Sequence, residues 1–152
     1  LVRAAEQARE RGFRSLVDAD APRFLAPASM IEEVRSACGE SGQDVPQTAG
    51  ELALTVYDSL ATDYARAVRE LESLTGTAYT SINIVGGGSS NQYLNQATAD
   101  ACRLPVLAGP TEETALGNLM VQLIASGELA DLAAARAMVR RSFDVRELRP
   151  RA

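Results

Sequence analysis

The feature that most constrains the fold is a glycine turn in the middle of the chain. Residues 79–85 are rich in β-branched and apolar side chains, which predicts a strand. They run directly into Gly86, Gly87 and Gly88. Glycines at such a point allow the backbone to turn sharply. The rest of the fold must therefore accommodate a strand that passes at once into whatever follows it.

The residues after the turn continue with a helix, a strand and a second helix. Ser89 and Gln92 have the spacing of a capping box, and an apolar face follows at helical spacing. This face consists of Tyr93, Leu94, Ala97 and Ala101. Residues 105–108 predict a second short strand, and Thr111 is expected to cap a helix over residues 112–126. The alternation of strands and helices predicts the α/β class.

The sequence before the turn is mainly helical. The helix predicted from residue 2 ends at Gly12, and Ser29 with Glu32 forms a capping box for a second helix that ends near Gly39. Two prolines interrupt the segment between these helices, which predicts an irregular crossing. Four apolar residues are expected to pin that crossing to the core: Phe13, Leu16, Phe24 and Leu25.

The strongest helix signal follows a second capping box, formed by Thr48 and Glu51. Apolar residues recur every three or four positions after it, which predicts one inward face. This face consists of Leu52, Val56, Leu60, Tyr64, Val68, Leu71 and Leu74. Gly76 is expected to close the helix as a left-handed cap. A helix of this length would cross a whole domain.

The predicted strands are too few for an independent sheet. Two or three strands are below the usual size, and buried parallel strands need neighbours on both sides. A last helix over residues 131–141 and an arginine-rich tail add none. We therefore expect the 152-residue chain to be part of a larger domain. Taken alone, it would self-associate through an uncovered sheet edge and apolar face.

Charge and hydropathy exclude several classes of partner. A net charge of −5 argues against nucleic acid, which is held by clustered cationic side chains. No apolar run reaches the length of a membrane span, and the first residues are too charged for a signal peptide. These features predict a soluble, cytoplasmic protein without a membrane partner. Cys38 and Cys102 lack a CxxC spacing and are expected to be buried free thiols.

Two residue types that often take part in catalysis are missing. The sequence has no histidine and no lysine, so all fifteen cationic side chains are arginine. Within this chain, that excludes a Ser-His-Asp triad, a histidine-ligated zinc, a Walker A lysine and a Schiff-base lysine. Acid–base chemistry would have to use aspartate, glutamate, tyrosine or cysteine.

The glycine turn could hold a phosphate. Glycines let the backbone approach a ligand, and the free amides of the next helix carry partial positive charge. The spacing does not fit GxGxxG, because Asn91 stands where the last glycine would be. On spacing alone, a mere tight corner is equally well supported. Gly87 and Asn91 together favour a ligand, since they offer bare backbone beside an amide donor and acceptor.

Other candidate residues have structural explanations. Glu112 and Glu113 suit the dipole at the start of a helix. Gly117 lies inside a predicted helix, where glycine costs about 1 kcal/mol relative to alanine, so it is expected to admit a close neighbour. The remaining acidic candidates are expected at the surface or at caps: Asp58, Asp63 and Asp100.

The run IVGGGSSNQYLNQATADACRLPVLAGPTEETALGN resembles the C-terminal signature of the FGGY carbohydrate kinases. That signature has a strand, a glycine pair, an asparagine four residues after the second glycine, LxQxxAD, a PV strand and a helix of the E-T-A-x-G-N type. Further similarity covers VDADAPRFLAPASM, the GQDVPQT loop and DSLATDYARAVRELESLTG. The resemblance therefore extends over nearly the whole chain.

The resemblance implies a fold and a set of site residues. The family has two ribonuclease-H-like domains of the actin, Hsp70 and sugar kinase superfamily, with ATP in the cleft between them. Residues 1–152 would be the later, helix-rich part of the second domain, with few strands. Gly87 matches the glycine that contacts ATP, and Asn91 matches the asparagine beside the adenine. Gly86 and Gly88 shape the same turn.

The resemblance also implies a reaction, the ATP-dependent phosphorylation of a ketose with Mg²⁺ bridging the phosphates. L-Rhamnulose is the first candidate substrate, and fuculose or xylulose are alternatives within the family. The catalytic aspartate, the Mg²⁺ ligands and most sugar contacts are expected outside this chain, so no catalytic residue is assigned and the chain alone is expected to be inactive. A noncatalytic helical interaction module with a kinase-like fold remains the rival interpretation.

Overall fold

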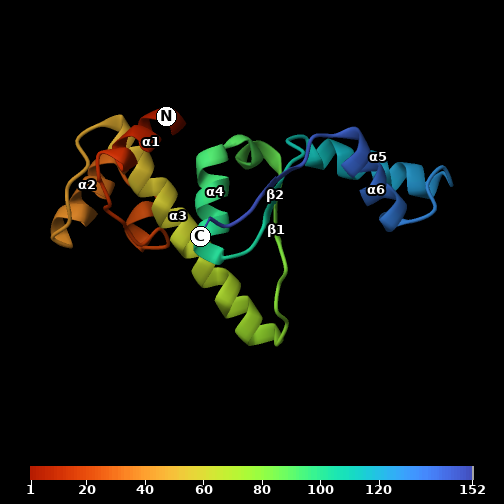
Figure 1. Ribbon diagram of the computed structural model, residues 1–152, viewed down its shortest axis with the longest axis horizontal. Coiled ribbons are helices and arrows are strands. Elements are labelled where there is room, and N and C mark those ends of the chain that lie inside the picture. The colour runs from red at the N-terminus through yellow and green to blue at the C-terminus, as the bar shows by residue number, and fades with distance from the viewer. Residues whose placement is uncertain (152) are drawn as a thin grey trace.

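The computed structural model describes residues 1–151. This range contains six α-helices, two short 3₁₀ helices and a small three-stranded sheet (Figure 1). The α-helices are α1 (Val2–Glu10), α2 (Met30–Glu40), α3 (Ala49–Thr75), α4 (Gln92–Cys102), α5 (Glu113–Ala125) and α6 (Leu132–Ser142). The 3₁₀ helices are η1 (Pro22–Phe24) and η2 (Gly86–Ser90), and the strands are β1 (Ile82–Ile84), β2 (Val106–Ala108) and β3 (Arg146–Leu148). The predicted helix-rich α/β class is confirmed.

Helix α4 is the central element of the fold. Figure 1 shows it between the long helix α3 and the strands. One side of α4 packs on α1 and α3 through the core residues Ala5, Ala8, Leu54, Ala61, Tyr93 and Ala97. Its other side packs on the sheet through Ala99, Val106 and Ala108, with Ile82, Ile84 and Leu148 at the margin. The helix that follows the glycine turn is thus held from both sides.

The helix ends follow the sequence closely. Ser29 caps α2 by accepting a hydrogen bond from the Glu32 amide. Thr48 and Glu51 form the complete, reciprocal capping box at the start of α3. Gly76 ends α3 in the left-handed conformation, with φ of 65°. These signals depend only on residues within one helical turn, which is why the sequence predicts them well.

The predicted inward face of α3 is wrong. The buried residues of this helix are Gly50, Leu54, Thr55, Ser59, Ala61 and Ala65. None of the residues of the predicted face is fully buried, and Leu74 at its end is 83% exposed. Helices α1 and α4 approach the small-residue side because small side chains allow close contact between helices. The apolar period of α3 is real, but within residues 1–151 helices α1 and α4 cover a different face of the helix.

The sheet contains one strand that the sequence did not reveal. Strand β2 lies in the centre, parallel to β1 and antiparallel to β3. Ile82 pairs with Val106, and Val106 pairs with Leu148 on its other side. Strand β3 lies in the arginine-rich tail, where charged residues hide the strand pattern. β1 and β3 form the two edges of this sheet.

The segment between α1 and α2 is irregular, as predicted, but only part of it is pinned. Phe13 packs against the core formed by α1, α3 and α4. Leu25, in contrast, is 85% exposed, and Leu16 is also exposed. Polar contacts hold the segment as well: Gln43 bonds to both backbone groups of Leu16, and Arg23 pairs with Glu33 and Glu40.

Helices α5 and α6 form a hairpin that extends away from the rest of the molecule (Figure 1). Met120 is the buried residue of α5, and Ala135 that of α6. Several large apolar side chains of the hairpin are exposed: Leu119, Val121 and Leu132. Cys38 and Cys102 are free thiols, but only Cys38 is buried as predicted, and Cys102 is partly exposed. No helix within residues 1–151 is both long and apolar enough to cross a membrane.

Candidate functional site

The glycine turn connects β1 to α4 through η2 and is fixed to the neighbouring loop. The Gly86 amide donates to the Pro110 carbonyl over 3.1 Å, and the Gly109 amide donates to the Ile84 carbonyl over 2.8 Å. Inside the turn, Ser89 Oγ donates to the Gly86 carbonyl over 2.7 Å. The two loops at the carboxyl ends of β1 and β2 therefore form one connected unit.

The three glycines have different roles. Gly86 has φ of 74°, a conformation that favours glycine, and a Cβ on it would lie 3.0 Å from Oε1 of the flexible Glu113 side chain. A Cβ on Gly88 would meet Ile84 at an ordinary 3.9 Å. A Cβ on Gly87 would have nothing within 4 Å. Gly87 thus leaves bare backbone facing open space, which is the property that a close-approaching ligand needs.

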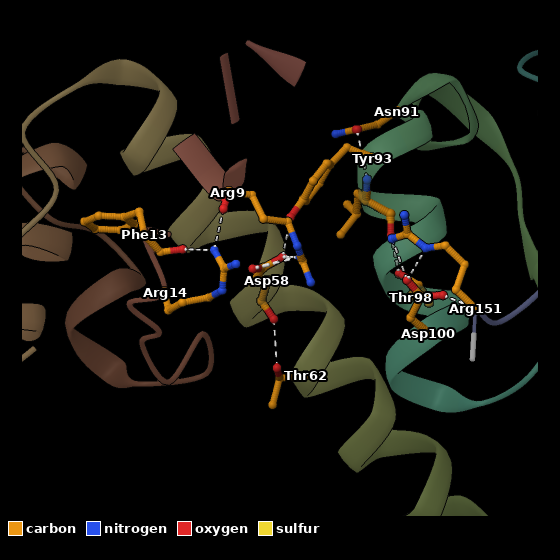
Figure 2. Close-up of polar contacts among 11 residues, drawn as sticks. Arg9, Phe13, Arg14, Asp58, Thr62, Asn91, Tyr93, Thr98, Asp100 and Arg151 are labelled. Carbon is orange, nitrogen blue, oxygen red and sulfur yellow. Dashed lines mark hydrogen bonds and ion pairs between the residues drawn. The ribbon is translucent and has the colours of Figure 1, made fainter. Parts of the chain in front are cut away.

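Asn91 caps α4, and the predicted capping box of Ser89 and Gln92 is wrong. Asn91 Oδ1 accepts a hydrogen bond from the Leu94 amide over 3.1 Å (Figure 2). Ser89 lies one turn earlier, in η2, because the glycines add a 3₁₀ turn before the α-helix begins. The side-chain oxygen of Asn91 is therefore occupied. Its amide nitrogen donates to no group within residues 1–151 and can serve a ligand.

Asn95, in the first turn of α4, also supports the glycine turn. It was not among the residues predicted from the sequence. Its side chain is 1% exposed, and Nδ2 donates to the Ser89 carbonyl over 2.9 Å. Oδ1 is buried without a hydrogen-bond partner among the described residues. The amide nitrogen thus holds the end of η2 in place. Asn95 lies in the first turn of α4, close in sequence to the glycine turn. Its burial depends on the packing of other elements, which the sequence does not show.

The second glycine segment differs from expectation in two respects. Gly109, with φ of 120°, is the close-approach glycine: a Cβ there would lie 2.8 Å from the Asp144 carbonyl oxygen. Gly117, which was predicted to have that role, has open space where its Cβ would be. Thr111 does not cap α5; the helix begins after Glu112 without a side-chain cap. The predicted Thr111 cap and Gly117 contact are therefore wrong.

Three side chains that no sequence pattern links meet where the first turn of α4 faces α1 and α3 (Figure 2). Arg9 from α1 donates to Tyr93 Oη over 2.7 Å and to the Asp58 carboxylate over 3.2 Å. Tyr93 Oη donates to Asp58 Oδ1 over 2.9 Å. Burial raises the pKa of the Tyr93 hydroxyl, Asp58 adds to that shift and Arg9 opposes it. We call Arg9, Asp58 and Tyr93 the clasp.

The clasp joins three helices and is not the surface position expected for Asp58. Tyr93 is 8% exposed, and its ring packs against Tyr57 at 5.8 Å between centroids. Arg9 also lies over the Tyr93 ring, 5.9 Å from its centroid. The members of the clasp are 35 to 84 residues apart in the sequence, so no local sequence pattern predicts that they meet. Asp63 is about as exposed as Asp58, at 19% against 17%, but it pairs locally with Arg66, three residues along the same helix.

The other end of α4 is held by the carboxyl-terminal tail. Asp100 accepts hydrogen bonds from the backbone and the guanidinium of Arg151 (Figure 2). Gln96 donates to Asp100 and to the Arg149 carbonyl. Asp100 therefore holds the carboxyl-terminal tail and does not act as the surface or capping residue that was expected. Among residues 1–151, no group of three or more histidine, cysteine, aspartate or glutamate side chains could hold a metal ion.

Comparison with known proteins identifies the class. The model for the C-terminal domain of the FGGY carbohydrate kinases matches residues 1–126, and the chain belongs to the FGGY family of carbohydrate kinases. The match includes the glycine turn, all of α4 and α5, and the clasp. Helix α6, strand β3 and the tail lie beyond it.

Curated relatives narrow the comparison. The chain is similar to the rhamnulokinase of Enterococcus faecalis, with 46% identity over 142 residues, which are 92% of this chain and 29% of the relative. It is also similar to the rhamnulokinase of Bacillus subtilis, with 42% identity over 148 residues, 97% of this chain and 30% of the relative. The chain thus spans about three tenths of the length of these relatives.

Proposed function

We propose that this chain is the later part of the second domain of a rhamnulokinase and supplies one wall of its ATP cleft. The full-length protein would transfer the terminal phosphoryl group of ATP to a hydroxyl of L-rhamnulose. Membership in the kinase family supports the reaction class. The rhamnulokinases of several bacteria, at 41–46% identity, support the choice of sugar.

The observation that carries the proposal is the open backbone at Gly87. A nucleotide can approach this position closely, because the glycine presents no side chain and no protein atom lies where a Cβ would be. The first-turn amides of α4 other than that of Leu94, together with the Asn91 side-chain nitrogen, lie on the same turn and can donate to phosphate or base. Gly86 and Gly88 would shape the turn without contributing side chains.

The rest of the catalytic machinery is assigned to sequence outside this chain. Mg²⁺ would neutralise charge on the phosphates of ATP, and its ligands are assigned to sequence outside this chain, since the described residues offer no cluster of metal ligands. No base is assigned within the chain either. In phosphoryl transfer, positioning and charge stabilisation supply most of the catalysis, and this turn would contribute to positioning.

The test uses the full-length protein that contains this chain. ATP binding is measured by calorimetry for the wild type and for Gly87→Ala, and turnover is measured with L-rhamnulose, L-fuculose and D-xylulose. A methyl group on Gly87 meets no protein atom, so the fold is retained while the ligand is pushed away. We expect ATP affinity to fall by about tenfold, or about 1.4 kcal/mol.

Gly39→Ala is the matched control. Its methyl group would make only an ordinary contact, 3.5 Å from Val45, in helix α2. ATP affinity is expected to stay at the wild-type value. Equal ATP affinity in Gly87→Ala and wild type would remove the turn from the site. Preference for fuculose or xylulose would reassign the substrate, and a wild type that binds no ATP would favour the noncatalytic module.

A further inference from the structure

We infer that Tyr93, held by Arg9 and Asp58, is a positioning residue for the nucleotide turn. The inference rests on the proposed function of that turn and extends it to three side chains that lie behind it. Tyr93 is the second residue of α4 and follows Asn91 by two positions. Its ring points away from the turn and into the helical core (Figure 2).

The geometry of the clasp fixes α4 against two other helices at once. The Tyr93 hydroxyl accepts from Arg9 on α1 and donates to Asp58 on α3, so both its donor and its acceptor capacity are used. A movement of α4 relative to α1 or α3 would change the length of at least one of these bonds. Hydrogen bonds to charged partners are stronger than those between neutral groups, which makes such a movement costly.

The turn needs this support because its other contacts come from the opposite direction. Gly86 is held by the Pro110 carbonyl on the sheet side, and Ser89 is held within the turn and by Asn95. None of these bonds reaches α1 or α3. Among the polar contacts of residues 1–151, the clasp is what joins the first turn of α4 to the helical body. Loss of the clasp would therefore leave Asn91 and the first-turn amides less well ordered before ATP binds.

Removing only the Tyr93 hydroxyl separates this role from folding. In Tyr93→Phe the ring stays in the core, and Arg9 and Asp58 can still pair directly over 3.2 Å. Ordering the turn would then be a cost of binding the nucleotide, as for any site that is not held in place beforehand. The loss should appear in nucleotide affinity and not in sugar affinity, because no sugar contact is assigned to this chain.

The experiment compares Tyr93→Phe with Tyr57→Phe in the full-length protein. Tyr57 packs on the Tyr93 ring, but its hydroxyl makes no hydrogen bond within the described residues, so the control removes the same atom without touching the clasp. We expect the dissociation constant and KM for ATP to rise about three- to tenfold in Tyr93→Phe. The KM for the sugar should change less than twofold. Tyr57→Phe should bind ATP like the wild type.

Hydrogen exchange without ATP gives a second measurement that does not depend on nucleotide binding. Amides of residues 86–95 are expected to exchange faster in Tyr93→Phe than in either the wild type or Tyr57→Phe. Unchanged exchange and unchanged ATP affinity would overturn the inference, as would an equal loss of ATP and sugar affinity. If the wild type binds no ATP while exchange responds as expected, the clasp orders the turn but the proposed nucleotide site is wrong.

Discussion

The helical body consists of α1, α3 and α4, and the hairpin consists of α5 and α6. Both contain leucines and small residues, but the body buries a leucine that the hairpin would leave exposed. In the body, small residues lie inside and the three helices approach closely, with the clasp joining them. In the hairpin, Leu119, Val121 and Leu132 are exposed, and Val121 and Leu132 line an open groove of about 680 Å³ between the hairpin and the sheet. Burial in this molecule therefore follows from neighbouring elements rather than from residue type.

The largest expected difference between the two regions is the response to truncating a leucine. Leu54 is 1% exposed in the core of the body, so Leu54→Ala should lower the free energy of unfolding by about 2–5 kcal/mol. Leu119 lies at the surface of the hairpin, so Leu119→Ala should cost less than about 1 kcal/mol. Urea unfolding of the purified proteins measures both. Equal losses would mean that the hairpin is packed as tightly as the body.

A glycine pair should sharpen the comparison, because the same change is expected to have opposite signs. A Cβ on Gly50 in α3 would lie 2.5 Å from the backbone oxygen of Ala4 in α1, so Gly50→Ala should destabilise by about 1–3 kcal/mol. Gly117 in α5 has open space there, so Gly117→Ala should stabilise by about 0.5–1 kcal/mol through helix propensity. Melting temperatures give both signs. A stabilising Gly50→Ala would contradict the close approach of α1 and α3.

The same contrast explains what could be predicted from the sequence. Helix ends such as Thr48 with Glu51 and Gly76 depend on neighbours within a few residues, and they were predicted correctly. The buried side of α3 depends on α1 and α4, so the periodic face was assigned to the wrong side. Strand β3 is paired only through β2, and its charged residues gave no strand signal.

The candidate site shows the same division. Gly86, Gly87, Gly88 and Asn91 were found because they are adjacent in sequence and match a family signature; their role in binding a nucleotide remains a prediction. Asn91 as a cap was missed in favour of Ser89, because the sequence does not reveal the extra 3₁₀ turn. The clasp could not be predicted from the sequence, since its members come from three helices and form no sequence motif.

The smallest expected effect concerns the tail that returns from the hairpin to the body. Burial of Asp100 alone would raise its pKa, but hydrogen bonds from Arg151 and Gln96 outweigh burial and lower the pKa. A carboxyl group whose pKa is lower in the folded state stabilises that state above its unfolded pKa of about 3.9 and loses this contribution as pH falls through the lowered value. Acid should therefore release the tail from α4.

Hydrogen exchange of residues 146–151 between pH 7 and pH 3, corrected for the intrinsic pH dependence of exchange, measures this release. We expect protection to fall below about pH 4 in the wild type. Asp100→Asn keeps a hydrogen-bond acceptor for Arg151 but removes the charge, so its tail should be less protected already at pH 7 and show little further change in acid. Body amides near Leu54 serve as the internal reference, because their protection depends on packing and not on Asp100. A tail that stays protected in Asp100→Asn at pH 7 would mean that strand pairing through β2, rather than the ion pair, holds the hairpin's return to the body.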